Sequence, residues 1–198
     1  MKILLVGASG AVGQAVRQTL AHHQVLTAGR NSGDFRVDLT DEASIRALFQ
    51  AAGRLDAIIS ATGKVHFGPL AEMSTEQFRI GLEDKLLGQI NLALIGQHHL
   101  NDGGSLTLTS GIISETPIRL GSNATTVNRA LEGFVLGAAA ELGRGLRINA
   151  VSPNVLAESW NKYQNFFPGF EPVPASRVAL AYRRSVEGVE NGQVLRVW

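Results

Sequence analysis

The segment from Gly7 to Gly13 is the part of the chain whose residue types and spacing most clearly indicate binding chemistry. Its sequence, Gly-Ala-Ser-Gly-Ala-Val-Gly, follows a short apolar run and precedes a stretch with helical periodicity. Glycines let the chain turn sharply and let a pyrophosphate approach the backbone, where free amides and the helix dipole stabilise the anion. We expect a dinucleotide to contact Gly7, Ser9, Gly10, Ala11, Val12 and Gly13. The alternative is a tight turn without a ligand.

The residues after the second predicted strand indicate which dinucleotide is bound. NAD-binding folds place an acidic residue here, against the ribose 2′-hydroxyl, whereas this chain has Arg30, Asn31 and Ser32. A guanidinium makes charge-assisted, often bidentate hydrogen bonds to phosphate. The sequence therefore favours NADP, with these three residues at its 2′-phosphate. The alternative for Arg30 is a solvated surface arginine.

Alternating strand and helix patterns predict how these residues are positioned. Short β-branched or leucine-rich runs alternate with amphipathic stretches, which indicates stacked βα units and a mostly parallel sheet. The expected strands are Lys2–Val6, Val25–Ala28, Phe35–Val37, Ala57–Ser60, Ser105–Thr109, Arg147–Val151 and Gln193–Val197. The expected helices are Ala11–His22, Asp41–Ala51 with Thr40 as its N-cap, Thr75–His98, Asn123–Leu142 and Ala175–Glu187. The predicted fold class is α/β, a Rossmann-type doubly wound parallel sheet of about seven strands with helices on both faces.

Length and composition predict one domain. The chain has 198 residues, of which 44% are hydrophobic and 18% charged, enough for a sizeable core and too apolar for disorder. Within this single domain, residues 1–198, the segment 153–174 has four prolines and little periodicity. A long irregular segment inside a compact domain is typically a lid or a binding loop.

Composition also excludes several classes of protein. The formal net charge is +1 and no polybasic run is present, which argues against a nucleic acid or an anionic membrane as partner. The absence of cysteine excludes disulfides and thiolate catalysis. His22-His23 and His98-His99 are adjacent pairs, which do not share a helix face, and no carboxylate is spaced to join them, so we expect no metal site. We expect a soluble, cytoplasmic protein with a small-molecule partner.

Several motifs together resemble the short-chain dehydrogenase/reductase family. The matching segments are Gly7-x-x-Gly10-x-x-Gly13, Val37-Asp38-Leu39, Ser60-Ala61-Thr62-Gly63, Leu106–Ser110, Arg147–Pro153 and Asn191–Val194. The resemblance covers essentially the whole chain and implies a Rossmann fold, a nicotinamide cofactor and redox chemistry on a carbonyl or alcohol. It also implies a catalytic role for Ser110 and cofactor contacts from Asp38, Leu39, Ala61, Thr62, Gly63, Pro153 and Val155.

The chain departs from this family at the reacting residues. Ala124 and Asn128 stand where the family has the tyrosine and lysine of Tyr-x-x-x-Lys, and Lys85 stands at the family's helical asparagine. Alanine has no proton to give and an amide does not titrate. Our hypothesis is that Lys85 reaches Ser110 and the cofactor ribose, and that Asn128 bonds the ribose or the lysine. Partial burial would lower the lysine pKa and let it donate a proton; alternatively, Lys85 snorkels to solvent.

Further departures concern the predicted lid. Glu158 replaces a threonine that the family places near the pyrophosphate, so either Ser159 takes that contact or Glu158 points away. Tyr163 is expected to pack rather than to donate a proton. His66, after the fourth strand, is a candidate for lining a substrate pocket, although a surface loop is the usual place for a histidine.

Two functions therefore remain open. The first is an NADP-dependent oxidoreductase with a rearranged active site and an unknown substrate. The second is an inactive NADP-binding sensor or scaffold, which the missing tyrosine and lysine favour. Gly133 and Gly137, four residues apart on one predicted helix, let another helix approach closely. With the family resemblance they predict a homodimer or homotetramer, and the alternative is close packing of this helix on the sheet.

Overall fold

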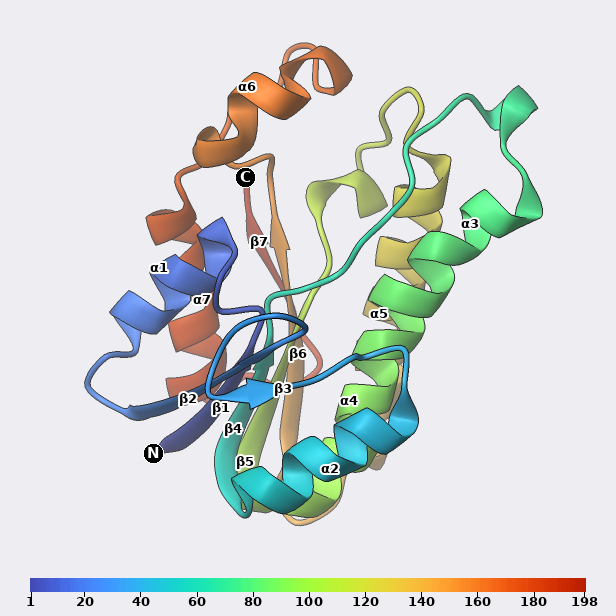
Figure 1. Ribbon diagram of the computed structural model, residues 1–198. Helices are drawn as coiled ribbons and strands as arrows, with labels where there is room; N and C mark the ends of the chain where they lie inside the picture. The colour runs from blue at the N-terminus through green and yellow to red at the C-terminus, as the bar shows by residue number, and fades with distance from the viewer.

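Seven parallel strands form one sheet at the centre of the molecule, in the order β3-β2-β1-β4-β5-β6-β7 (Figure 1). The computed structural model describes residues 1–198. The strands are β1 (Lys2–Val6), β2 (Gln24–Gly29), β3 (Phe35–Arg36), β4 (Leu55–Ser60), β5 (Leu100–Thr109), β6 (Arg147–Pro153) and β7 (Val194–Val197). This arrangement confirms the predicted Rossmann-type α/β fold.

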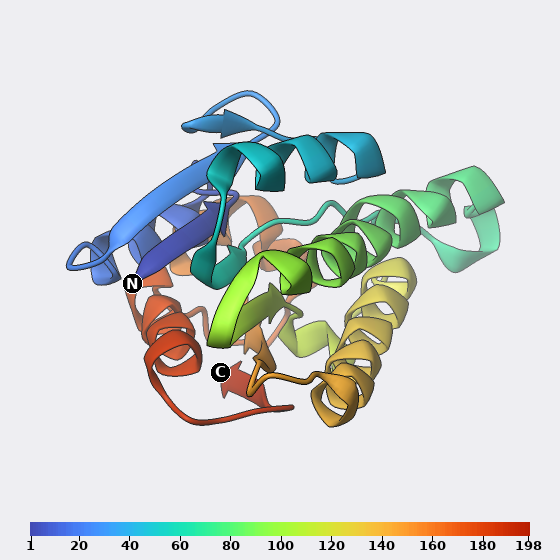
Figure 2. The same cartoon turned by 90° about the horizontal axis from the view of Figure 1, so that it is seen from below.

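Helices cover both faces of the sheet, which explains why its central strands are apolar on both sides. The helices are α1 (Ala11–Thr19), α2 (Glu42–Ala52), α3 (Thr75–Gly81), α4 (Gly88–Gly96), α5 (Ser122–Glu141), α6 (Trp160–Tyr163) and α7 (Ala175–Glu187). Helices α1 and α7 cover one face, and α2, α4 and α5 cover the other (Figures 1 and 2). Along β1, Ile3 and Leu5 pack in the first layer while Leu4 packs in the second. None of these helices is both long and apolar enough to span a bilayer.

The second helix begins one residue later than the sequence predicts. Thr40 is not its N-cap, because the Thr40 hydroxyl and backbone N–H both donate to Asp38 Oδ1, at 2.7 and 3.0 Å. Asp41 is the N-cap instead, and its Oδ1 accepts from the Ala43 N–H at 2.9 Å. The prediction was wrong because the turn before the helix already engages the threonine side chain.

The predicted helix Thr75–His98 is one continuous rod that changes pitch in the middle (Figure 2). Residues Leu82–Leu87, between α3 and α4, form a π-helical turn. The wider turn rotates the faces of the rod, so that Lys85 is only 9% exposed and Leu87 is 47% exposed. The Gln89 side chain donates to the Lys85 carbonyl at 3.2 Å and to the Thr109 carbonyl at 3.0 Å, which ties this turn to the end of β5.

Strand order places a ligand crevice at one edge of the sheet. The order reverses between β1 and β4, because β2 and β3 extend to one side of β1 and the later strands to the other. In open α/β sheets ligands bind outside the carboxyl ends of the strands at this reversal. The glycine segment after β1, the loop after β4 and the residues after β5 all start from that edge.

Candidate functional site

The turn between β1 and α1 is shaped by two glycines that cannot be replaced without moving the backbone. Gly7 has a φ of +91°, and a Cβ on Gly13 would lie 2.1 Å from the Gly7 carbonyl oxygen. Gly10 is the N-cap of α1, and no side chain caps that helix. The uncapped helix start leaves backbone donors and the positive dipole end facing the crevice, where a pyrophosphate fits.

Two cavities lie beside this turn. The smaller, of about 120 Å³, is lined by Val6, Gly29, Arg30, Val37, Leu39, Thr62 and Asp84. The larger, of about 340 Å³, is lined mainly by residues that follow β4, β5 and β6 and has Thr62 in common with the smaller. Among the predicted cofactor contacts, those lining the larger cavity are Val12, Ala61, Thr62, Gly63, Pro153 and Val155. The turn therefore stands between two hollows that an extended dinucleotide can reach.

Arg30 lies at the smaller cavity, already paired with carboxylates. Its guanidinium donates to Asp38 at 3.0 Å and lies 3.6 Å from Asp84. The hydrogen bond to Asp38 raises the Arg30 pKa, and hydrogen bonds from Thr40 are the main cause of a lowered Asp38 pKa. Arg30 is exposed, as are the neighbouring Asn31 and Ser32. A phosphate at this place would share the guanidinium with two acids.

The larger cavity has an apolar wall formed partly by the segment 153–174. Val155 and Phe167 from that segment pack against Ile112, Ile113 and Ala124. The segment holds the short helix α6 and an isolated bridge between Leu156 and Val173. In Figure 1 it stands above α1 and α7 on the side of the crevice opposite α3.

Lys85, Ser110 and Asn128 all line this cavity, so the structure brings the three predicted reacting residues together. The Lys85 ammonium donates to the Ser110 carbonyl oxygen at 3.1 Å. Gly63, with a φ of +131°, makes room for the lysine stem, since a Cβ there would lie 2.3 Å from Lys85 Cγ. Burial lowers the pKa of Lys85 to about 8, against the opposing effect of the Glu132 charge. The lysine therefore does not snorkel to solvent.

Asn128 brings an unpaired polar atom to the same cavity. The residue is 2% exposed, and its Oδ1 has no hydrogen-bond partner. Buried polar atoms without partners are uncommon in folded proteins. A hydroxyl of a bound ligand would provide the missing donor.

A buried carboxylate, that of Glu132, lies next to Ser110, and the sequence did not lead us to expect it. Both the Ser110 and the Ser114 hydroxyls donate to Glu132 Oε1, each at 2.6 Å, and Arg129 lies 3.4 Å from Oε2. Glu132 is 7% exposed although it is charged. The signal was present in the sequence: Glu132 follows Asn128 by four residues, which puts both on one helix face.

In the predicted lid, Glu158 points away from the glycine turn. Its carboxylate accepts from the Ala175 N–H at 2.9 and 3.1 Å, at the start of α7. Ser159 lines the cavity, and its contact with the pyrophosphate stays a prediction. Tyr163 lines the cavity and its ring lies 6.3 Å from that of Phe67. His66 is not a lining residue; its neighbours Val65 and Phe67 are.

The prediction that no carboxylate joins a histidine pair is wrong for His22 and His23. Glu187, at the end of α7, has Oε1 at 2.8 Å from His22 Nε2 and 3.2 Å from His23 Nε2. Its Oε2 accepts from Arg183 at 2.8 Å. These contacts fasten the turn after α1 to α7, on the face of the sheet away from Lys85. Spacing along the chain could not show them, because the acid is 165 residues from His22.

Known proteins share both the sequence pattern and the fold. The family profile described as enoyl-(acyl carrier protein) reductase matches residues 4–192. The protein lin1944 from Listeria innocua is 50% identical, and its crystal structure superposes with a TM-score of 0.99 over 100% of both chains. A small-chain dehydrogenase crystallised with NADPH is 26% identical, with a TM-score of 0.88 over 100% of this chain and 96% of its own.

Curated relatives are more distant. Hydroxynaphthalene reductase arp2 of Aspergillus fumigatus is 30% identical over 140 residues, which are 68% of this chain and 51% of the fungal enzyme. The match therefore spans about half the length of that relative. The putative ketoacyl reductase 2 of the granaticin polyketide synthase, from Streptomyces violaceoruber, is 25% identical over 83% of this chain and 76% of its own. With the family profile matched along nearly its whole length, the chain belongs to the short-chain dehydrogenase/reductase family.

Proposed function

We propose that this chain is an NADP(H)-dependent oxidoreductase that reduces the carbonyl group of a small, largely apolar substrate, with Lys85 as its proton donor. The observation that carries the proposal is that the buried Lys85 lines the larger cavity. Only one hydrogen bond, to the Ser110 carbonyl, is assigned to its three N–H groups. The remaining N–H groups are available to a carbonyl oxygen in the cavity.

Residues on both sides of the glycine turn fit an NADP molecule. In this proposal the turn from Gly7 to Gly13 holds the pyrophosphate, Arg30 with Asn31 and Ser32 holds the 2′-phosphate, and Asp38 and Leu39 lie by the adenine. Support comes from the tight turn that only a glycine at position 13 allows, the unpaired Asn128 Oδ1 and the NADPH bound to the 26%-identical dehydrogenase. The nicotinamide end would contact Thr62, Gly63, Pro153 and Val155.

The chemistry divides between cofactor and chain. When bound, NADPH supplies the hydride that a carbonyl carbon accepts. Lys85 holds the proton that the carbonyl oxygen takes as its π bond breaks, and the neutral amine that remains is reprotonated from solvent. Because the Ser110 hydroxyl donates its proton to Glu132, the serine oxygen can only accept a hydrogen bond from the cavity. Asn128 orients the ribose through its free carbonyl oxygen.

The cavity wall and the relatives suggest where to look for the substrate. Val65, Phe67 and Phe167 make one side of the cavity apolar and partly aromatic. Two relatives carry the names hydroxynaphthalene reductase and ketoacyl reductase. The test is NADPH oxidation, followed by absorbance, against a panel of aromatic ketones, quinones and β-ketoacyl thioesters. We expect turnover with at least one of these classes, and lack of turnover across the panel would contradict the proposal.

The second candidate function is NADP binding without chemistry. The observation in its favour is Ala124, which lines the cavity at 1% exposure where the family has a tyrosine. A sensor or scaffold would bind NADPH tightly and reduce nothing. Isothermal titration on the same preparation, beside the carbonyl panel, separates the two functions.

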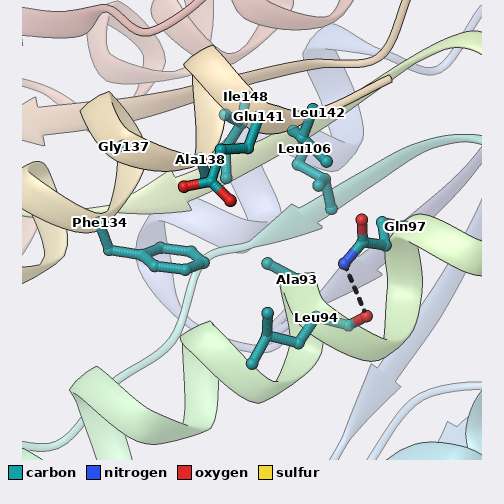
Figure 3. Close-up of a pocket in the computed structure, with 10 residues that line it drawn as sticks. All are labelled: Ala93, Leu94, Gln97, Leu106, Phe134, Gly137, Ala138, Glu141, Leu142 and Ile148. Atoms are coloured by element: carbon teal, nitrogen blue, oxygen red, sulfur yellow. Dashed lines mark hydrogen bonds between the residues drawn. The ribbon is translucent and has the colours of Figure 1, made fainter. Parts of the chain in front are cut away.

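We also propose that two copies of the chain associate through α4 and α5. Between these helices is an apolar groove of about 330 Å³, in which Phe134 and Gly137 face Ala93 and Leu94 (Figure 3). Cβ atoms on Gly133 or Gly137 would meet nothing within 4 Å, so these glycines do not serve packing within the chain. Leu94 and Leu136 are 48% and 68% exposed. A second copy would cover this surface.

Light scattering tests the association. We expect a dimer or larger assembly at micromolar concentration, and a monomer mass would contradict the proposal. Gly137→Leu should weaken assembly by overfilling the contact while leaving the folded monomer intact, because the added side chain meets only solvent in one copy. Leu180→Ala, on the exposed side of α7, is the control and should change neither property.

A further inference from the structure

Glu132 is a buried carboxylate that no step of the proposed reaction uses. It lies on α5, one helical turn after Asn128, and does not line the cavity. Its Oε1 accepts two hydroxyl hydrogen bonds of 2.6 Å, from Ser110 and Ser114. Hydrogen bonds to a charged acceptor are short and strong, so this arrangement fixes the rotamers of both serines.

The contact decides what Ser110 can offer to a ligand. A serine hydroxyl has one proton and two lone pairs. The proton is directed to Glu132 at 2.6 Å, whereas the second acceptor within reach, the Asn128 carbonyl, is at 3.4 Å. The serine at the position of the family's catalytic serine is therefore an acceptor toward the cavity. A substrate carbonyl, which is also an acceptor, finds no donor there.

The same carboxylate acts on the lysine. Lys85 packs against the loop after β4 at Gly63, against the end of β5 at Ser110, and against α5. The loop and the strand end contribute no charged side chain to this contact. On its own helical rod Asp84 accepts from the Lys64 N–H and lies near Arg30, and Glu83 lies near Arg79. Glu132 is the charge on α5 that stabilises the Lys85 ammonium.

We propose that Glu132 is a positioning residue: it withdraws the Ser110 proton from the cavity and serves as counter-charge to the Lys85 ammonium, so that the lysine rather than the serine donates in the reaction. This inference rests on the proposed reduction for its consequence, but not for its test. Glu132 itself touches neither substrate nor cofactor. Its other charged neighbours, Arg129 and Arg196, lie on the side that faces solvent.

The test measures the Lys85 pKa directly, on the full chain without cofactor or substrate. The chain has four lysines, Lys2, Lys64, Lys85 and Lys162, so competitive acetylation between pH 6 and 11, read by mass spectrometry, resolves each one. We expect half-reaction of Lys85 near pH 8 in the wild type. In Glu132→Gln we expect this pH of half-reaction to fall by about one unit or more, because the variant lacks the opposite charge that favours the protonated amine.

Two further variants make the outcome specific. Glu83→Gln removes the same charge two residues from Lys85, but at an exposed position paired with Arg79; it should leave the Lys85 pKa unchanged. If circular dichroism shows that Glu132→Gln does not fold, Glu132→Asp replaces it. The shorter carboxylate lies farther from the lysine, so the Lys85 pKa should fall by a smaller amount than in Glu132→Gln. An unchanged Lys85 pKa in the folded Glu132 variant overturns the proposal.

The result does not depend on finding a substrate. A lowered Lys85 pKa in Glu132→Gln, in a chain that reduces nothing, would reject the proposed reduction and keep the electrostatic pair. In a chain with turnover, the alkaline limb of the rate profile must shift by the same amount as the Lys85 pKa. A limb that stays in place would overturn the assignment of Lys85 as the donor that Glu132 controls.

Discussion

The two ends of the crevice are built in different ways. At the cofactor end, the turn from Gly7 to Gly13 is defined by backbone: a positive φ at Gly7, absent Cβ atoms and an uncapped helix start. At the reacting end, Lys85, Ser110, Asn128 and Glu132 act through side chains carried by three separate segments. The first end carries the glycine motif of the resemblance, whereas at the second the resemblance aligns Ala124 and Asn128 with a tyrosine and a lysine.

This contrast follows from what each end must recognise. A pyrophosphate is bound by amides and a dipole that any sequence supplies once the chain takes the right path, so only the glycines are restricted. Proton transfer needs a titrating group at a defined place, but that group can come from more than one element. In the proposed reaction the titrating group is a lysine from the π-helical turn, beside the end of β5. The proposed reaction thus keeps the scaffold and takes its proton donor from another element.

The largest effect is expected from one methyl group added at the cofactor end. In Gly13→Ala the new Cβ would lie 2.1 Å from the Gly7 carbonyl oxygen and 2.7 Å from Ala8 Cα, so the turn must shift. Overpacking of this kind costs about 1–3 kcal/mol of unfolding free energy, and loss of amide alignment should weaken NADPH binding by roughly 100-fold, about 2.7 kcal/mol. Urea unfolding and isothermal titration measure both effects.

Gly10→Ala is the matched control for the folded turn. Its Cβ would be 3.7 Å from the Gly7 carbonyl, an ordinary contact, so its unfolding free energy should stay within about 1 kcal/mol of the wild type. Equal destabilisation by Gly13→Ala and Gly10→Ala would show that the lack of space for a Cβ at position 13 does not determine the turn.

At the reacting end, Lys85→Met should separate binding from turnover. We expect a fall in turnover of at least tenfold, about 1.4 kcal/mol in the barrier, while NADPH affinity changes only a few-fold. The control is Lys64→Met, at an exposed lysine in the loop after β4. It should leave both turnover and NADPH affinity unchanged. Unchanged turnover in Lys85→Met would end the catalytic role and leave Lys85 as a ribose-binding or structural residue.

The pH dependence follows from the direction of the Lys85 shift. Burial lowers its pKa from 10.5 to about 8, so the ammonium needed for reduction is lost as the pH rises through about 8. The rate of carbonyl reduction should fall there, and the reverse oxidation should rise. The folded state binds fewer protons than the unfolded state between these two pKa values, so Lys85 makes folding more favourable as pH rises from 8 to 10.5. Lys85→Met removes both dependences.

The sequence predicted the fold and the position of the glycine turn because both depend on local patterns. Apolar strand runs identified every strand of the sheet, and the Gly7–Gly13 spacing located the turn between β1 and α1. The placement of Lys85, Ser110 and Asn128 around one cavity was also anticipated, because the family resemblance aligned three distant segments. The roles of these residues remain predictions.

What the sequence missed depends on geometry that periodicity does not contain. A regular helix puts Lys85 at the edge of an apolar stripe, whereas the π-helical turn buries it. The acceptor of the Ser110 proton, Glu132, and the partner of His22, Glu187, lie 22 and 165 residues away along the chain. The spacing of four residues places Glu132 on the helix face of Asn128, but only the folded chain brings Glu132 to Ser110 and Glu187 to His22.

The smallest of the expected effects concerns the choice between NADPH and NADH. Here the cofactor end relies on a side chain, that of Arg30. A charge-assisted hydrogen bond is worth about 1.5–3 kcal/mol, or roughly 10- to 150-fold in affinity. Because Arg30 already pairs with Asp38 and lies near Asp84, a 2′-phosphate must compete with two carboxylates. We therefore expect NADPH to bind about tenfold more tightly than NADH, at the low end of that range.

Arg30→Ala should remove most of the difference, and Asp84→Asn should widen it by relieving the competition. Isothermal titration of both cofactors checks this, with Arg36→Ala, whose side chain bonds the Gly33 carbonyl, as the matched control. Equal affinities of the wild type for the two cofactors would show that the exposed guanidinium serves its acidic neighbours alone.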